Sequence, residues 1–173
     1  MKISKYNKKQ QQEVNDLVRE SFGIEEGDHV VALIQEIREG KYYLPEYDLV
    51  ATEGNEVIGH CMISILPFED CQEEMLLLSP VAVKKSWQNK SMGTKMVREA
   101  LKKVKNKKYL GIIVEGDPHY YHRFGFTTSV EFGIFANEAI QMPSEECLMA
   151  MELVDGGLDG FFGEVDFSIY TTL

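Results

Sequence analysis

The sequence predicts an α/β protein with a single mixed sheet, and three features lead to this fold class. Residues 75–115 read as strand, helix, strand, an order that implies two parallel neighbours joined by a right-handed crossover. Strands at about 47–52 and 56–66 flank Glu53-Gly54-Asn55, which is strong turn chemistry for an antiparallel hairpin. Two amphipathic helices precede the hairpin. We therefore expect a mostly antiparallel sheet with one parallel pair and flanking helices.

The amino-terminal region is expected to hold a short edge strand at 2–6 and two helices. The first helix stops at Gly23. Its apolar stripe consists of Val14, Leu17, Val18 and Phe22. The second helix takes Asp28 as its N-cap and ends at Gly40. Its buried face consists of Val30, Val31, Leu33, Ile34 and Ile37. The acidic segment 22–29 between the helices is expected to be a solvated loop.

The central stretch runs from Leu76 to Gly93 and reads as a buried strand, a polar turn and the start of a helix. Apolar runs at 76–78 and 81–83 suit a strand covered on both faces. Pro80 cannot donate to a strand ladder, so it marks a place where neighbouring strands part. The next helix has a buried face made of Met92, Met96, Val97, Ala100, Leu101 and Val104. The turn before it therefore presents unpaired N–H groups at a helix N-terminus, a ready site for phosphate.

A buried strand at 109–114 follows this helix. Asp117 is then placed as the N-cap and Pro118 as the first residue of a short helix that Gly125 stops. Further strands are expected at about 147–153 and 163–170. Because no repeat or glycine-serine linker divides the chain, residues 1–173 are expected to form one domain, with a core of about 1–153 and a carboxyl-terminal extension at 154–173.

The chain has a formal charge of −10, but the charge is unevenly distributed. Between 84 and 108 there are ten basic residues and one acidic residue, a local charge of +9, so the rest of the chain carries −19. A lysine-rich helix face is often only a solvated surface. Because this one coincides with the phosphate-type turn, we expect it to attract an anionic cofactor. The acidic remainder favours a cationic co-substrate and argues against a nucleic-acid partner.

The cysteines and histidines form no recognisable metal or redox motif. Cys61, Cys71 and Cys147 have spacings that match no zinc or redox centre, which favours reduced structural thiols. His119 and His122 could form a ligand pair but lack a third ligand. No apolar run approaches the roughly 18 residues that span a membrane. We expect a cytoplasmic protein with no metal and no membrane partner.

Two stretches of the chain resemble a known family. Pro80-Val81-Ala82-Val83 followed by Gln88-Asn89-Lys90-Ser91-Met92-Gly93 resembles the acetyl-CoA signature of the GCN5-related N-acetyltransferase (GNAT) superfamily, whose turn usually reads Gln/Arg-x-x-Gly-x-Gly/Ala. Ser91 stands in place of the first glycine. Tyr121, four residues before Gly125, resembles the tyrosine of the second signature. The carboxyl-terminal segment is similar to that of the YhbS-like bacterial branch, so the resemblance covers nearly the whole chain.

The resemblance implies the acyl-CoA N-acyltransferase fold, with a central splayed parallel strand pair. It implies acetyl-CoA as co-substrate, an acceptor that carries an amine, and a monomer or homodimer. The residues implied in cofactor binding are Val81, Ala82, Val83, Gln88, Asn89, Lys90, Ser91, Met92, Gly93 and Thr94. The backbone amides of Val81 and Val83 are the candidates for holding the acyl carbonyl and the pantetheine arm.

Acetyl transfer to an amine needs a proton acceptor for the amine and a proton donor for the departing thiolate. Tyr121 is the candidate donor, since a phenol with a reference pKa near about 10 can share its proton with a thiolate. Glu115 is the second candidate catalytic residue, and it is a candidate base. His119, His122, the acids of segment 22–29 and a water chain remain alternatives for the base.

Two other functions are compatible with the sequence. A CoA-binding or regulatory module that has lost catalysis is suggested by Ser91 and by the absence of an evident base. A protein that contacts nucleic acid through the lysine-rich helix is disfavoured, because the chain is acidic overall and the lysines are not interleaved with aromatic residues.

Overall fold

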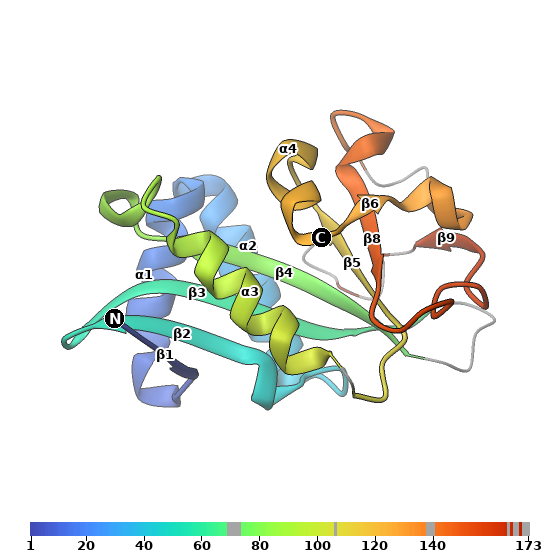
Figure 1. Ribbon diagram of the computed structural model, residues 1–173. Coiled ribbons are helices and arrows are strands. Elements are labelled where there is room, and N and C mark those ends of the chain that lie inside the picture. Colours follow the sequence, from blue (N-terminus) through green and yellow to red (C-terminus); the bar gives the residue numbers. More distant parts are fainter. Residues whose placement is uncertain (69–73, 106, 138–140, 166, 168–169, 171–173) are drawn as a thin grey trace. The chain divides into compact units, whose positions relative to one another are not determined.

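The computed structural model describes residues 1–68, 74–105, 107–137, 141–165, 167 and 170 (Figure 1). The helices are α1 (Gln11–Phe22), α2 (Ile24–Glu39), α3 (Met92–Val104) and α4 (Pro118–Tyr121). The strands are β1 (Lys2–Lys5), β2 (Asp48–Glu53), β3 (Glu56–Leu66), β4 (Met75–Val83), β5 (Gly111–Glu115), β6 (Thr127–Thr128), β7 (Ile134–Ala136), β8 (Leu148–Glu152) and β9 (Gly163–Val165). Short 3-10 turns include η2 (Pro45–Tyr47), η3 (Lys85–Trp87) and η4 (His122–Phe124).

The main sheet has the hydrogen-bonded order β1-β2-β3-β4-β5-β8-β6. The recorded pairings of β1 with β2, β2 with β3, β5 with β8, and β6 with β8 are antiparallel. The pairing of β4 with β5 is parallel, at Leu76–Ile112 and Leu77–Ile113. The predicted α/β class, with a mostly antiparallel sheet and one central parallel pair, is confirmed.

The chain divides into two compact units. The first unit comprises Met1–Ser64, Ser79–Lys103 and Tyr170–Leu173, and the second comprises Ile65–Leu78 and Val104–Ile169. Strands β3 and β4 contribute residues to both units. The organisation of the chain as one domain therefore stays a prediction.

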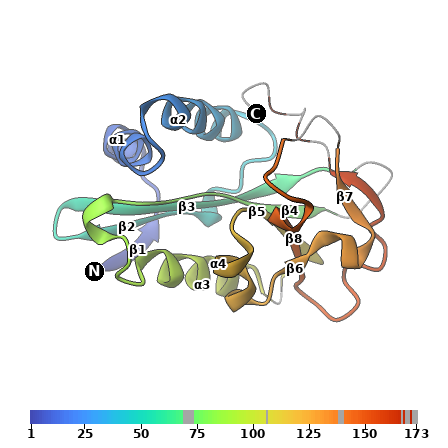
Figure 2. The same cartoon turned by 90° about the horizontal axis from the view of Figure 1, so that it is seen from above.

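In the first unit, helices lie on both faces of the strands. Helices α1 and α2 cover one face of β2 and β3, and α3 covers the other (Figure 2). Gly59 of β3 permits close packing of α3, because a Cβ atom at this position would overlap the sulfur of Met96. The predicted helical face from Met92 to Val104 is confirmed, since all six of its apolar residues are buried.

The boundary between the first two helices was predicted incorrectly. Asp28 is not an N-cap, and the segment before it is not a loop, because α2 begins at Ile24 with Gly23 as its N-cap. Gly23 has a φ of 90°, which lets the chain leave α1 and start α2 within one residue. Asp28 lies inside α2 and instead pairs with Arg19 of α1, 2.5 Å from its Nε. Gly27 lets the two helices approach, since a Cβ there would lie 2.6 Å from the Arg19 Cα.

In the second unit, β5 pairs along its whole length with β8, and β6 pairs with the other edge of β8. Strand β9 covers Gly163–Val165 of the strand predicted at 163–170, and residues 166 and 168–169 of that prediction lie outside the described part. Strand β9 does not join the main sheet but pairs in parallel with β7 in a separate two-stranded sheet. The core includes an edge-to-face pair of Phe68 and Phe161, with ring centroids 5.5 Å apart.

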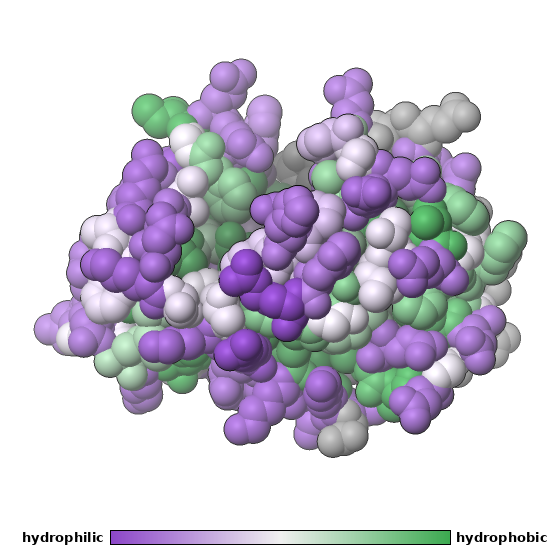
Figure 3. Space-filling model, turned by 45° about the horizontal axis from the view of Figure 1, so that its top comes forward, coloured by the Kyte–Doolittle hydropathy of each residue, from purple (hydrophilic) through white to green (hydrophobic). Residues whose placement is uncertain are grey.

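Hydrophilic residues are spread over the face drawn in Figure 3, with apolar areas interspersed among them. Within the described ranges, no helix is both long and apolar enough to cross a membrane.

Candidate functional site

The turn between β4 and α3 has the backbone of an anion site. Asn89 and Ser91 both have a φ of 59°, in the left-handed region. The Ser91 carbonyl accepts the Lys95 N–H at 3.0 Å, so α3 starts directly after this residue. The N–H groups at the start of a helix have no intrahelical acceptor, and left-handed residues in the preceding turn help to form a concave nest of amides. This arrangement suits a phosphate group.

Ser91 occupies the position where the family turn usually has glycine, and its backbone shows why glycine is used there. A left-handed conformation costs an L-residue about 1–2 kcal/mol, whereas glycine adopts it freely. The serine therefore keeps the shape of the turn at an energetic cost. The turn is held to its strand by the Gln88 Nε2 group, which donates to the Val83 carbonyl at 3.1 Å.

The ten predicted cofactor-binding residues all lie in the first unit, but they differ in exposure. Gln88, Asn89, Lys90 and Ser91 are exposed. Ala82 and Met92 have buried side chains that belong to the core. For these two residues, only the backbone is available for a ligand. Val81 and Val83 are partly exposed in the second half of β4.

Two amides of this segment contact side chains that the sequence did not single out. The Val83 N–H donates to the Ser21 Oγ at 3.4 Å, and the Lys85 N–H donates to the Glu20 Oε1 at 2.9 Å. Ser21 and Glu20 lie in the last turn of α1. Nothing in the local sequence indicates these contacts, because about sixty residues separate the partners.

In the second unit, Tyr121 is the last residue of α4, and its ring is held by neighbouring groups. The Asp117 Oδ1 caps α4 by accepting the His119 N–H at 2.9 Å, as predicted, and Gly125 ends the following turn with a φ of 100°. The ring of Tyr121 packs edge-to-face on Tyr120 and Phe126, at centroid distances of 4.9 and 5.9 Å.

Gly116 makes room for the Tyr121 ring. A Cβ atom at Gly116 would lie 2.5 Å from the Tyr121 Cε2, which is closer than such atoms approach. The Gly116 N–H also donates to the Cys147 carbonyl at 3.0 Å, which fixes the backbone below the ring. The position of Tyr121 is thus set by aromatic packing and by the lack of a side chain at Gly116.

Glu115 is the last residue of β5, where it pairs with Leu148 of β8. Desolvation by the surrounding protein raises the pKa of its carboxyl above the ordinary value. The side chain is nevertheless exposed to solvent. A carboxylate with a raised pKa and access to solvent can accept a proton and pass it to water.

The predicted histidine pair of the second unit is exposed to solvent. His119 and His122 are both exposed, and no group of three potential metal ligands occurs within the described ranges. Cys61 is a free thiol whose pKa is raised by burial to about 12, so it remains protonated. Cys147 is also free, and Cys71 lies outside the described residues.

A hollow in the first unit is formed where α1 meets α2. It has a volume of about 460 Å³ and is lined by Phe22, Gly23, Ile24, Glu25, Glu26 and His29. Glu25 and Glu26 thus lie in the first turn of α2, where negative charge suits the helix dipole. Their local role in starting the helix is sufficient to explain their presence.

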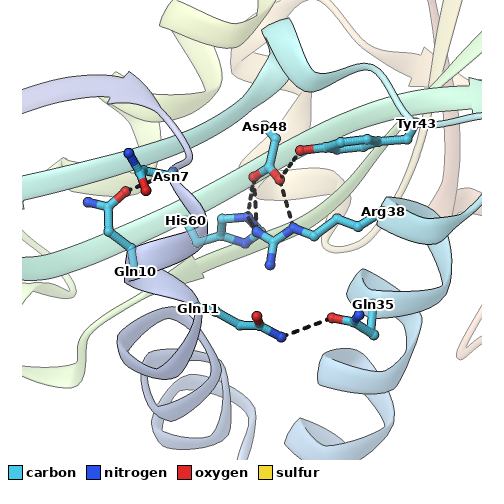
Figure 4. Close-up of polar contacts among 8 residues, drawn as sticks. All are labelled: Asn7, Gln10, Gln11, Gln35, Arg38, Tyr43, Asp48 and His60. Atoms are coloured by element: carbon cyan, nitrogen blue, oxygen red, sulfur yellow. Dashed lines mark hydrogen bonds and ion pairs between the residues drawn. The ribbon is translucent and has the colours of Figure 1, made fainter.

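A buried polar network in the first unit was not predicted (Figure 4). Asp48 of β2 accepts hydrogen bonds from the Arg38 Nε at 2.8 Å, the Tyr43 hydroxyl at 2.9 Å and the His60 Nε2 at 2.8 Å. The Arg38 guanidinium stacks 3.4 Å over the Tyr6 ring centre. Burial raises the pKa of Tyr43, and the neighbouring Asp48 raises it further. An aspartate and a histidine within otherwise apolar strands are the sequence signal that could have revealed the network.

Comparison with known proteins finds a family model and a curated relative that match most of this chain. The model of the acetyltransferase (GNAT) family matches residues 11–126, a range that includes both predicted signatures. The uncharacterized N-acetyltransferase YhbS of Escherichia coli strain K12 is 26% identical over 156 residues, which cover 89% of this chain and 88% of that protein.

Solved structures share the fold. The crystal structure of YhbS from Escherichia coli in complex with CoA has a TM-score of 0.83 and 23% identity, and the match covers 94% of this chain and 87% of that chain. A GNAT family acetyltransferase from Brucella melitensis in complex with acetyl-CoA has a TM-score of 0.73 and 20% identity, covering 95% of this chain and 92% of that chain. Since the family model spans more than half of the sequence, from α1 to the residues that follow α4, the chain belongs to the acetyltransferase (GNAT) family.

Proposed function

We propose that the protein is an acetyl-CoA-dependent N-acetyltransferase that moves an acetyl group directly to a primary amine of a small molecule or peptide. The observation that carries the proposal is the left-handed turn of Asn89 and Ser91 at the start of α3. It combines amides, a helix N-terminus and basic surroundings, which together suit a pyrophosphate. The CoA in the related YhbS structure and the acetyl-CoA in the Brucella melitensis structure support the choice of cofactor.

The cofactor would use mainly the backbone of the first unit. The turn from Gln88 to Thr94 would hold the pyrophosphate, and the amides of Val81 and Val83 would bind the pantetheine arm. Exposed basic residues of α3 would attract the adenosine phosphate through screened charge. These residues are Lys95, Arg98 and Lys102, which recur at helical spacing on the outer face.

In the reaction, the amine nitrogen forms a bond to the thioester carbonyl carbon, and the carbon–sulfur bond breaks. The amine must first lose a proton, because a lysine-like amine has a pKa near about 10.4. Glu115 is proposed to accept that proton, since its raised pKa makes it a stronger base than an ordinary carboxylate. Tyr121 is proposed to donate the proton that the departing sulfur takes up, after which its phenolate recovers a proton from water.

The acceptor is proposed to be cationic. The chain outside the basic segment 84–108 carries a formal charge of −19, which raises the local concentration of positively charged amines. Binding of the acceptor would then weaken as salt is added, because the attraction is largely between exposed charges.

The first experiment is a calorimetric titration of the protein with CoA. Saturable binding at micromolar to millimolar CoA is expected, and an absence of heat at millimolar CoA would contradict the proposal. The second experiment incubates the protein with acetyl-CoA and a panel of polyamines, amino sugars and lysine peptides, and follows thiol release with a chromogenic reagent. If thiol is released only in the presence of one class of amine, the acceptor belongs to that class.

A CoA-binding module without catalysis is the second candidate. It is favoured by Ser91, whose left-handed backbone is an energetic cost that the usual glycine avoids. The two functions are separated by the same pair of experiments, because such a module binds CoA in the calorimeter but releases no thiol with any amine.

A further inference from the structure

The end of α1 is attached to the segment that is proposed to bind the cofactor. Ser21 accepts the Val83 N–H at 3.4 Å, and Glu20 accepts the Lys85 N–H at 2.9 Å. Both contacts join side chains of α1 to backbone amides, and all four residues belong to the first unit. Helix α1 therefore touches the segment at the amide assigned to the pantetheine arm and at the amide just before the phosphate turn.

The two contacts differ in strength. A separation of 3.4 Å lies beyond the usual range for an N–H···O hydrogen bond, so the Ser21 contact is weak and easily exchanged. The Glu20 contact has an ordinary length and a charged acceptor, which makes it the stronger of the two. The Val83 N–H can thus change partner, while the Lys85 N–H stays bound to Glu20.

The position of Glu20 is unfavourable for the helix that carries it. A carboxylate in the last turn of a helix faces the negative end of the helix dipole. The contact with the Lys85 N–H offsets this cost and holds a negative charge beside the cofactor segment. A hydrogen bond from Lys84 to Glu56 raises the pKa of Lys84, and the charge of Glu20 raises it further. Glu20 and Glu56 therefore partly cancel the positive charge of Lys84 before the phosphate turn.

We propose that Ser21 and Glu20 set the affinity of this protein for its cofactor, Ser21 by competing with the pantetheine arm for the Val83 N–H and Glu20 by repelling the phosphates. A backbone amide has one proton to donate, so a cofactor carbonyl bound to Val83 must displace the Ser21 hydroxyl. The inference rests on the proposed function, because competition requires that CoA binds this segment. Its consequence is that both residues weaken CoA binding and so favour release of the product.

Calorimetry compares the dissociation constant of CoA for the wild type with those of four variants, Ser21→Ala, Ser21→Thr, Glu20→Gln and the control Glu13→Gln. Ser21→Ala should bind CoA about two- to fivefold more tightly, because loss of a weak neutral hydrogen bond frees the Val83 N–H. Ser21→Thr retains the hydroxyl and should bind like the wild type. Glu20→Gln keeps an acceptor for the Lys85 N–H but removes the charge, and it should also bind about two- to fivefold more tightly at low salt.

Salt and a matched control separate the two effects. The gain from Glu20→Gln should shrink at about 0.5 M salt, where the screening length falls to a few ångströms, whereas the gain from Ser21→Ala should persist. Glu13→Gln removes the same charge from an exposed position on α1 and should leave the dissociation constant unchanged. Weaker binding by Ser21→Ala would mean that the hydroxyl holds the cofactor, which overturns the inference.

Amide hydrogen exchange gives an independent readout without CoA. The Val83 amide should exchange faster in Ser21→Ala than in the wild type, and the Lys85 amide should exchange faster in Glu20→Ala. If the wild type and all variants fail to bind CoA, the proposed function and the inference both fall. If the wild type binds CoA and the Ser21→Ala and Glu20→Gln variants bind it equally well, only the inference falls.

Discussion

The Asp48 carboxylate and the His60 imidazole lie 2.8 Å apart, from Oδ1 to Nε2, and both side chains are fully buried (Figure 4). The imidazole must donate from Nε2, because an ionised carboxylate has only acceptors. Arg38 at the end of α2 supplies the balancing charge, and its side chain is 8% exposed. The Asp48 carboxylate of β2 therefore links His60 of β3 and Arg38 of α2, and this carboxylate has no access to water.

Replacing Asp48 with asparagine should strongly destabilise the first unit. The variant leaves the Arg38 guanidinium buried without a counter-charge, a change that typically costs about 3–5 kcal/mol. For a chain of this length, this corresponds to a fall of roughly 6–20 °C in the melting temperature. Thermal unfolding followed by circular dichroism measures it. Asp16→Asn is the control, because Asp16 is 63% exposed and its ion pair with Arg19 should contribute little. Equal melting temperatures for the two variants would contradict the role of Asp48 as the counter-charge of Arg38.

Stability should fall in acid because of the same aspartate. Burial raises the pKa of Asp48, but the hydrogen bonds and charges of His60 and Arg38 outweigh burial, and the pKa is lowered overall. The unfolded chain then takes up a proton at a higher pH than the folded protein does. The stability from ionised Asp48 is present above the unfolded value of about 3.9, and it is lost as the pH falls through the lowered value. Urea unfolding across this range should show a shallower acid slope for Asp48→Asn than for the wild type.

Ser91→Gly should stabilise the turn and tighten the binding of CoA. Glycine relieves the left-handed strain of Ser91, worth about 1–2 kcal/mol, although it adds freedom to the unfolded chain. Melting temperature and the calorimetric dissociation constant are the measurements. Ser86→Gly, in the 3-10 turn η3, is a matched change without strain to relieve, and it should lower the melting temperature slightly. Weaker CoA binding by Ser91→Gly would show instead that the serine hydroxyl holds a phosphate.

Tyr121→Phe should lower turnover by about 10²- to 10⁴-fold, the usual contribution of a general acid, and should leave CoA affinity nearly unchanged. Tyr120→Phe is the internal control, since successive residues of a helix point roughly 100° apart. Steady-state rates with a fixed amine and calorimetry with CoA separate the two properties. Full activity in Tyr121→Phe, or equal losses of activity in both variants, would contradict the role of Tyr121 as the proton donor.

Gly116→Ala should displace the Tyr121 ring and reduce turnover by roughly 10- to 100-fold, because misplacement of a catalytic group by about 1 Å has effects of this size. CoA affinity should not change, since Gly116 lies outside the cofactor segment. Gly160→Ala serves as the control, because a Cβ atom there would meet nothing within 4 Å. The near-ultraviolet circular dichroism of the tyrosines should change only in the first variant. An unchanged rate in Gly116→Ala would show that the ring position is not critical.

Most local elements could be predicted from the sequence. The bounds of β3 and β4, the buried face of α3 and the Asp117 cap of α4 agree with the pattern of apolar residues and capping residues. These features depend on residues that are adjacent or a few positions apart, so the information is contained in short windows of sequence. The predicted loop before Asp28 was a local failure, which arose because a single glycine can join two helices.

The sequence by itself thus determined the α/β class and the order of elements, and it predicted a phosphate-type turn with Ser91 at a glycine position. The tertiary structure decided that Ser91 adopts a left-handed backbone and that Asp48 and His60 form a buried pair. It also decided that Glu20 and Ser21 of α1 accept hydrogen bonds from backbone amides near that turn. The physical reason is the range of the interactions. Propensities and caps act within a few residues, whereas the partners of a buried charge or an amide are set by which distant segments pack together.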